Sequence, residues 1–212
     1  MRQRDGLHPG TQFARQSLQD RLLRRTHHHW DHAGGNLQLK DLYDVKIRGA
    51  ASDRDRIPGL DIAQADNSVF QFAGHDIQVM ETPGHTIGHI IYYIPSAQAA
   101  FVGDTIFALG CGRLFEGTPD QMFKSLSKIA QLPEETRLYC AHEYTLSNGR
   151  FALSIDPDNA DLNSYMETAT AKREKNIPTV PTTVAAEIKA NPFMRAATAS
   201  ELGEIRAAKD NF

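Results

Sequence analysis

Residues 26–32 read THHHWDH. Within six positions this stretch holds four metal-binding side chains, His27, His29, Asp31 and His32. In an extended segment the side chains of residues 27 and 29 point the same way, while the next two ligands follow on a turn and reach a neighbouring site. A glycine pair at 34–35 then lets the backbone bend sharply into the next element. Imidazole and carboxylate groups suit zinc, iron or manganese, so the motif indicates a metal-dependent hydrolase with room for two metals.

Three successive histidines alone are more typical of a tag remnant or a solvated polar loop, but three further stretches favour a metal site. His85 lies in TPGHTIGHI (82–90), in a loop between two apolar runs. Asp104 ends a buried-looking strand in AAFVGDTIF (99–107), where a carboxylate needs a partner charge or a metal. His142 ends another strand in TRLYCAHEYT (136–145). Together with the first motif they supply seven ligands, enough for two sites.

These motifs, in this order from residue 26 onward, resemble those of the metallo-β-lactamase superfamily. Within it, GCGRLFEGT (110–118), AHEYTLSN (141–148) and NPFMR (191–195) resemble glyoxalase II, the hydroxyacylglutathione hydrolases. The resemblance implies an α/β fold: an αββα sandwich, incomplete at its N-terminus, followed by a small C-terminal α-helical domain. The expected parts are a non-matching segment at 1–25, a catalytic domain at 26–147 and a helical glutathione-binding domain at 148–212.

The resemblance also implies the roles of the ligands. His27, His29 and His85 are expected to hold one metal, Asp31, His32 and His142 the other, and Asp104 to bridge both. Asp31 and Asp104 are the expected catalytic carboxylates. The cofactor is expected to be two divalent ions per chain, with zinc the first expectation and iron or manganese as alternatives, because these ligand types accept all three.

The implied substrate is a glutathione thioester, S-D-lactoylglutathione, hydrolysed to D-lactate and glutathione in the second step of methylglyoxal detoxification. Glutathione carries carboxylates, which call for basic donors. By motif match the contacts fall on Arg113, Tyr144, Arg206 and Lys209, whereas without the resemblance a solvated surface charge is the simpler reading of each basic residue. Phe115 stands where some relatives carry Tyr, so one hydroxyl is missing.

The pattern of the chain predicts strands first and helices afterwards. Strands are expected at 45–47, 69–72, 77–80, 90–94 and 99–102, with a short helix over 37–45. Thr118, Pro119 and Gln121 form the capping signature of a helix that buries a stripe of Met122, Leu126 and Ile129. Beyond residue 148 the strands are expected to be finished, and helices are expected at 159–176, 184–191 and 199–210, with a Pro-containing linker at 178–181.

The first 25 residues depart from the family pattern. They contain six Arg, show no strand-like alternation, and place Arg24 and Arg25 where an apolar strand is expected to run into Thr26. A displaced reading frame, a truncated gene model or an Arg-rich transit segment would each produce this. One sheet is therefore expected to lack strands and to have an unpaired edge.

Composition limits the class of protein. A chain of 212 residues with 41% apolar content can build a real core. The net charge of −3 gives no general attraction to nucleic acid or to a membrane surface, and no apolar run approaches the roughly 18 residues of a membrane span. Cys111 and Cys140 imply no disulfide framework and are expected to be small buried thiols. We expect a cytoplasmic monomer that binds neither nucleic acid nor membrane.

Two alternatives stay open beside the glutathione thioesterase. The metal site could serve another chemistry of the superfamily, as in persulfide dioxygenases, lactonases or β-lactamases, although those relatives generally lack the helical tail. The chain could also be an inactive, truncated metal-binding fragment, because its first strands are missing from the pattern.

Overall fold

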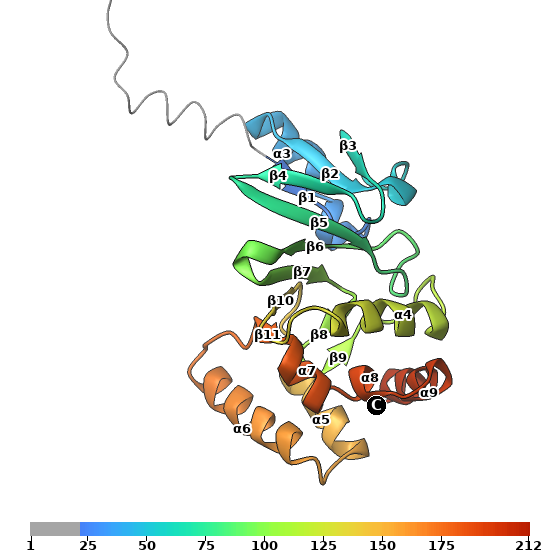
Figure 1. Ribbon diagram of the computed structural model, residues 1–212, viewed down its shortest axis with the longest axis vertical. Coiled ribbons are helices and arrows are strands. Elements are labelled where there is room, and N and C mark those ends of the chain that lie inside the picture. Colours follow the sequence, from blue (N-terminus) through green and yellow to red (C-terminus); the bar gives the residue numbers. More distant parts are fainter. Residues whose placement is uncertain (1–21) are drawn as a thin grey trace, which may run out of the picture.

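The computed structural model describes residues 22–212, which form two β-sheets between layers of helices (Figure 1). The smaller sheet is parallel, in the order β1-β2-β3. Its strands are β1 (Leu22–Arg24), β2 (Lys46–Ala50) and β3 (Ile62–Gln64). The larger sheet is mixed, in the order β11-β10-β7-β6-β5-β4. Its strands are β4 (Val69–Phe72), β5 (His75–Glu81), β6 (Ile90–Ile94), β7 (Ala99–Gly103), β10 (Arg137–Cys140) and β11 (Thr182–Thr183). A small ribbon pairs β8 (Ile106–Phe107) with β9 (Gly110–Cys111).

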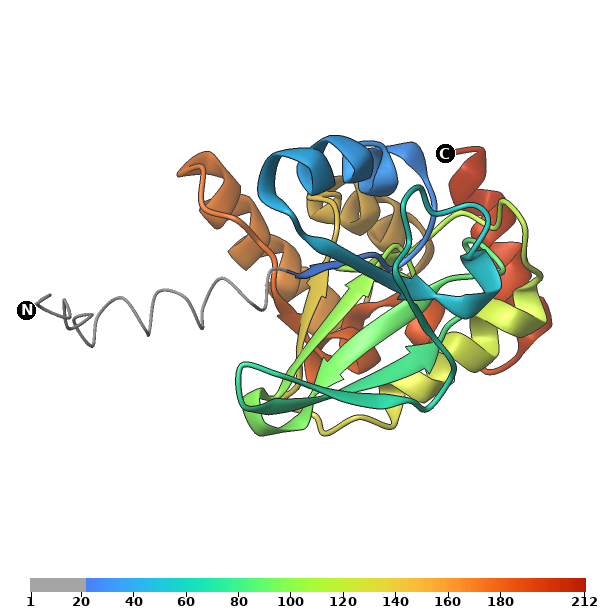
Figure 2. The ribbon, with the colours of Figure 1, turned by 90° about the horizontal axis from the view of Figure 1, so that it is seen from above.

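Helices cover the outer faces of the two sheets. Seen from above, α2 and α3, the smaller sheet, the larger sheet and α4 follow one another as layers (Figure 2). The helices are α2 (Trp30–Ala33), α3 (Asn36–Tyr43), α4 (Pro119–Ala130), α5 (Thr145–Ile155), α6 (Ala160–Glu174), α7 (Val184–Ala190), α8 (Pro192–Arg195) and α9 (Ala199–Asp210), with 3₁₀ turns η1 (Ala51–Asp53) and η2 (Pro95–Ala97). None of the helices in the described part of the chain has the length and apolar character that a membrane crossing requires.

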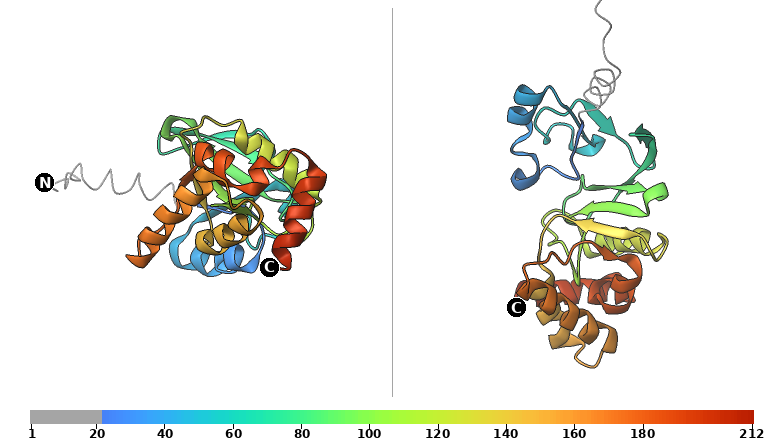
Figure 3. Two further views of the ribbon diagram at one scale, coloured as in Figure 1. Left: turned by 90° about the horizontal axis from the view of Figure 1, so that it is seen from below. Right: turned by 90° about the vertical axis from the view of Figure 1, so that its left-hand side faces the viewer.

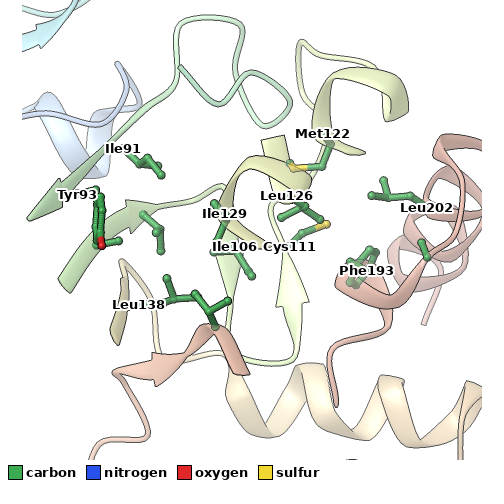
Figure 4. Packing of buried hydrophobic residues seen from close by; sticks show 14 of the residues in the cluster. Ile91, Tyr93, Ile106, Cys111, Met122, Leu126, Ile129, Leu138, Phe193 and Leu202 are labelled. Atoms are coloured by element: carbon green, nitrogen blue, oxygen red, sulfur yellow. The ribbon is translucent and has the colours of Figure 1, made fainter. Parts of the chain in front are cut away.

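The helices α5 to α9 gather at the end of the molecule away from the smaller sheet (Figure 3). They are not a separate body, because the largest apolar cluster joins both parts of the chain. Met122, Leu126 and Ile129 of α4 belong to this cluster together with Phe193 and Leu202 of the helical part, and Met122 and Leu126 lie on the side toward them (Figure 4). The two parts of the chain on either side of the predicted boundary at residues 147 and 148 therefore share one apolar core.

Local patterns explain most elements. All of the first four residues of β6 are buried, as expected for a strand covered on both faces. The predicted capping box starts α4: Thr118 N donates to Gln121 Oε1 (2.9 Å), and Gln121 N donates to Thr118 Oγ1 (3.3 Å). The same type of side-chain cap begins α9, where Glu201 N donates to Thr198 Oγ1 (3.2 Å). The predicted strand at 90–94 and the predicted capping box of α4 are confirmed.

Two expectations about strands are wrong. Residues 22–24, expected to lie outside the sheets, form β1, because main-chain pairing with β2 does not require apolar side chains. The Arg24 guanidinium instead lies 3.7 Å over the Phe72 ring, where the aromatic face stabilises the cation. Strands also do not end before residue 148, since β11 pairs antiparallel with β10. Residues 1–21 of the predicted segment 1–25 lie outside the described residues.

Within the described part of the chain, β1 pairs on one side only, which agrees with the expected unpaired edge. A cavity of about 710 Å³ lies along this edge and is lined by Leu23, Phe101 and Tyr139 among others. Asp31 and His142 also border it. The open edge of the smaller sheet therefore lies beside the metal-binding motif.

Candidate metal centre

The THHHW turn lies between the two sheets and is fixed by main-chain hydrogen bonds. Arg25 N donates to Arg48 O (2.8 Å), and Ile90 N donates to Thr26 O (2.8 Å). The turn leads into α2, and Gly34 ends that short helix against the Trp30 ring, where a Cβ would come within 2.6 Å. Strand pairing before the motif and a glycine after it therefore set the direction of its ligand side chains.

Three histidines form the first cluster of metal-binding atoms, called here the inner group: His27, His29 and His85. Their ligand atoms lie within 4.8 Å of one another, and His85 Nε2 is 3.0 Å from His29 Nδ1. His85 Nδ1 lies 2.9 Å from the carbonyl oxygen of Arg113. Because a carbonyl only accepts, this Nδ1 carries the proton, and Nε2 keeps a free lone pair that faces the group.

The second cluster, called here the outer group, consists of Asp31, His32 and His142. Asp31 Oδ2 lies 3.2 Å from His142 Nε2 and 3.5 Å from His32 Nε2. The Asp31 side chain is 57% exposed and that of His142 is 28% exposed, whereas His27 of the inner group is fully buried. The outer group therefore faces solvent.

Asp104 lies between the two groups. Its Oδ1 is 3.1 Å from His32 Nε2, and its Oδ2 is 3.4 Å from His142 Nε2 and 3.7 Å from His85 Nε2. The carboxylate follows β7 directly and is buried. One carboxylate thus contacts ligands of both groups, which is the position expected of a bridging ligand.

The charge states of these side chains fit a bound cation. Burial lowers the pKa of His27, His29 and His85, so each is neutral at pH 7 and can donate a lone pair. Burial alone would raise the pKa of Asp104, but the hydrogen bond from His32 and the neighbouring histidines hold it below its usual value. His27 Nε2 is buried without a hydrogen-bond partner among residues 22–212, and His32 Nε2 and Asp104 Oδ1, which face each other at 3.1 Å, have no further partner there. A divalent ion would satisfy such orphaned atoms.

The His89 side chain fixes the main chain of Asp104. Asp104 N donates to His89 Nε2 (3.1 Å), so the ring proton is on Nδ1, which lies 3.1 Å from Thr82 Oγ1 and 3.0 Å from Thr105 Oγ1. Complete burial lowers the pKa of His89 to about 3, which keeps the ring neutral. The ring also stacks on His27 at 4.8 Å. His89 is thus a buried structural histidine that orients candidate ligands without being one.

Basic side chains line a cavity of about 840 Å³ that opens beside the metal ligands. Its lining includes the four predicted substrate contacts, Arg113, Tyr144, Arg206 and Lys209. Three of them already have partners. Arg206 donates to Cys111 O (2.9 Å) and to Asp210 Oδ1 (2.9 Å), Lys209 donates to Ser147 O (3.2 Å), and Arg113 Nε lies 3.2 Å from Asp210 Oδ1. The cavity nevertheless combines a cationic wall with the candidate metal ligands His29, His85 and Asp104.

Arg150 of α5 also lines this cavity and was not predicted from the sequence. It is exposed, and in the described part of the chain it makes neither a hydrogen bond nor an ion pair. Helical spacing could have found it, because α5 begins directly after the AHEY stretch and Ser147, three residues earlier, lines the same cavity. Arg150 is therefore the cation with the most freedom to meet an anionic ligand.

Two aromatic side chains flank the two groups. Phe115 contacts His29 edge-on at 5.6 Å and His85 at 5.3 Å between ring centroids. Tyr144 stacks on His142 at 5.0 Å. Both rings are largely exposed and line the basic cavity. Each group of ligands therefore presents an aromatic neighbour to a molecule that enters.

The two cysteines take no part in this chemistry. Cys111 is buried in β9, and Cys140 is half-buried at the end of β10. Both are free, and burial raises the pKa of each thiol to about 11. The expectation of small buried thiols is confirmed for Cys111, whereas Cys140 is less buried than expected.

Comparison with known proteins agrees with this arrangement. Residues 26–142 match the metallo-beta-lactamase superfamily, and residues 143–212 match the hydroxyacylglutathione hydrolase C-terminus. The hydroxyacylglutathione hydrolase of Maricaulis maris is 52% identical over 201 residues, covering 88% of this chain and 78% of the relative. That of Roseobacter denitrificans is 51% identical, covering 88% and 79%.

Solved structures share the fold at lower identity. ETHE1 from Myxococcus xanthus has a TM-score of 0.63 and 21% identity, with 93% of this chain and 74% of that chain covered. A di-iron-bound structure of TTHA1623 has a TM-score of 0.56 and 23% identity, with 89% and 86% covered. At this identity the likeness concerns the fold alone. On the family matches and the identity to its relatives, the chain belongs to the hydroxyacylglutathione hydrolases of the metallo-β-lactamase superfamily.

Proposed function

We propose that this chain hydrolyses the thioester of S-(2-hydroxyacyl)glutathione, with S-D-lactoylglutathione as the main substrate, to a 2-hydroxy acid and glutathione. The observation that carries the proposal is the position of the metal-binding cluster at the wall of a cationic cavity. The names of its relatives support the same activity.

The proposed cofactor is a pair of divalent ions. The inner group would bind one ion and the outer group would bind the second. Asp104 would bind both ions. Such a pair supplies a water of lowered pKa and polarises the carbonyl group that the water attacks. Zinc is our first expectation, and iron and manganese fit the same ligands. The finding that supports a two-ion site is that Asp104 contacts both groups, since its Oδ2 lies near His85 of the inner group and near His142 of the outer group.

The protein's own residues would position the substrate. Arg113, Arg150 and Lys209 offer cations to the carboxylates of glutathione, and Tyr144 offers an aromatic face beside the outer group. Asp31 is the exposed carboxylate of the centre and would accept a hydrogen bond from the attacking water. Water adds to the thioester carbonyl, the carbon–sulfur bond breaks, and the sulfur leaves with the electron pair as a thiolate. A thiolate of ordinary pKa, about 8.5, needs little protonation to depart.

Three finer statements stay predictions for this chain: the identity of the metal, a monomeric state and a cytoplasmic location. Elemental analysis of protein purified from its own host would identify the ions. Sedimentation equilibrium would give the mass of the assembly, against the 23.6 kDa of one chain.

The deciding experiment is hydrolysis of S-D-lactoylglutathione by the purified chain, with added metal and with a chelator. We expect turnover that the chelator removes and zinc restores. The matched control substrate is S-D-lactoyl-N-acetylcysteamine, which has the same thioester but no carboxylates, and we expect its KM to be much higher. Equal KM values would contradict the role of the cationic cavity.

The same preparation separates the alternatives. Oxygen consumption with glutathione persulfide, together with one metal per chain, would favour a dioxygenase, and turnover of a lactone in place of the thioester would favour a lactonase. If the chain shows no cooperative thermal transition, or if added zinc does not change its melting temperature, the result would favour the inactive fragment.

A further inference from the structure

A network of charged side chains links the two segments that carry the inner group, and none of its members is a metal ligand. It consists of His28, Asp53, Arg56 and Glu116, which come from three separate parts of the chain. His28 lies between the ligands His27 and His29 in the sequence, so whatever fixes His28 also fixes its two neighbours.

Asp53 is the buried centre of this network. It ends η1, directly after β2, and its side chain is fully buried. One carboxylate oxygen lies 3.0 Å from His28 Nδ1, and the other accepts a hydrogen bond from Arg56. A buried carboxylate is stable only with such partners.

Asp53 also contacts the segment that carries His85. A Cβ on Gly88 would lie 2.0 Å from Asp53 Oδ1, so the carboxylate lies directly against the main chain of this glycine. Any side chain at position 88 would displace it. Position 88, three residues after His85, therefore requires a glycine because the carboxylate approaches its main chain so closely.

Glu116 closes the network on the other side. Its Oε2 accepts a hydrogen bond from Ile87 N (2.8 Å), and its Oε1 accepts one from Arg56 Nη1 (2.5 Å) and lies 3.6 Å from His28 Nε2. Burial would raise the pKa of Glu116, but these hydrogen bonds hold it below its usual value, so it is ionised. The Arg56 guanidinium thus bridges two carboxylates, one on each side of His28.

We propose that Asp53, Arg56 and Glu116 are positioning residues that hold the His27–His29 turn and the His85 loop at ligand distance, and so set the metal affinity of the inner group. This rests on the proposed division of the ligands between two ions. The planar fork of Arg suits the bridge, because it reaches both carboxylates at once, whereas a Lys would reach one. The outer group has no contact with this network among the described residues.

The test is zinc titration of Arg56→Met and Arg56→Lys against a competing chelator, with cobalt absorption as a second readout of ligand geometry. We expect one of the two sites to weaken about 10-fold or more in Arg56→Met, less in Arg56→Lys, and the other site to keep its affinity. The control is Lys40→Met, which removes an ion pair of similar kind with Asp61 (2.5 Å) that touches neither ligand segment.

Each result is decisive. Two sites of wild-type affinity in Arg56→Met would overturn the inference, and so would equal weakening in Lys40→Met, because that would show a general effect on stability. If Arg56→Met does not fold, Arg56→Lys alone decides by the same comparison. Failure of the wild-type chain to bind two ions would instead count against the proposed two-ion site itself.

Discussion

The inner and outer groups use the same kinds of side chain in different surroundings. The inner group consists of histidines, of which His27 and His85 are buried and His29 is half-buried. A carbonyl fixes His85, and two carboxylates fix His28, the neighbour of His27 and His29. The outer group includes the exposed Asp31 and borders both the basic cavity and the open edge of β1. A ligand atom that is held in place before the ion arrives loses less entropy on binding. We therefore expect the inner group to bind more tightly and the outer group to exchange its ion and meet solvent.

The largest effect is expected where the two groups meet. Asp104→Ala removes the carboxylate that contacts both, and we expect kcat/KM to fall about 1000-fold or more, because several kcal/mol of transition-state stabilisation depend on the ions. Steady-state kinetics with S-D-lactoylglutathione and metal analysis of the same sample would measure it. The exposed Asp76→Ala on β5 is the control and is expected to behave as wild type. Full activity of Asp104→Ala would remove the bridging role.

Metal removal distinguishes the two groups directly. With a mild chelator we expect the ions to leave in two phases, a faster one from the outer group and a slower one from the inner group. His142→Ala should abolish the faster phase and His27→Ala the slower, since each removes one ligand of its group. Stopped-flow absorbance of the chelator complex would record both phases. A single phase in the wild-type chain would show that the two groups lose their ions at the same rate, against the difference in their burial.

The seven residues proposed as ligands could be predicted because each lies in a short, recognisable motif, and the structure brings them together. The residues that support the inner group could not be predicted in this way. ASDRDR (51–56) looks like a polar surface loop, yet Asp53 is fully buried because His28 and Gly88 come to it from distant parts of the chain. Glu187 is a similar case. It lies on a helix of ordinary pattern, but it accepts hydrogen bonds from Leu109 N (2.9 Å) and Thr182 Oγ1 (2.7 Å) in the core. Contacts between residues that are far apart in the chain leave no periodic pattern in the sequence.

The fold shows the same division between local and long-range information. The helix α4 was predicted together with its cap, because Thr118 and Gln121 are three residues apart. The strand β1 was missed because Arg24 and the following Arg25 do not look like part of a strand, and only the pairing with β2 defines one. The strand β11 is short and follows a proline, and only its partner β10 makes it a strand.

The next prediction separates two cations in the cavity beside the outer group. Arg206 is 6% exposed and donates to Cys111 O and Asp210, so Arg206→Ala should raise KM and also destabilise the fold by about 2 kcal/mol, the usual value for a hydrogen bond to a charged group. Arg150→Gln should raise KM with no change in the melting temperature, because Arg150 is exposed and unpaired within residues 22–212. Thermal melts beside kinetics would test both. A fall in kcat alone for either variant would contradict a binding role.

The smallest expected effect concerns the aromatic side chain beside the inner group. Phe115 is exposed, contacts His29 and His85 edge-on, and lines the basic cavity, so a hydroxyl added by Phe115→Tyr would point into the space that the substrate fills. One additional hydrogen bond contributes about 1 kcal/mol, so KM should fall about 5-fold with kcat unchanged. Tyr144→Phe, beside the outer group, is the matched removal of a hydroxyl and should raise KM by a similar factor if that hydroxyl binds substrate. If Phe115→Tyr changes kcat while Tyr144→Phe changes only KM, the inner group, and not the outer, limits the chemical step.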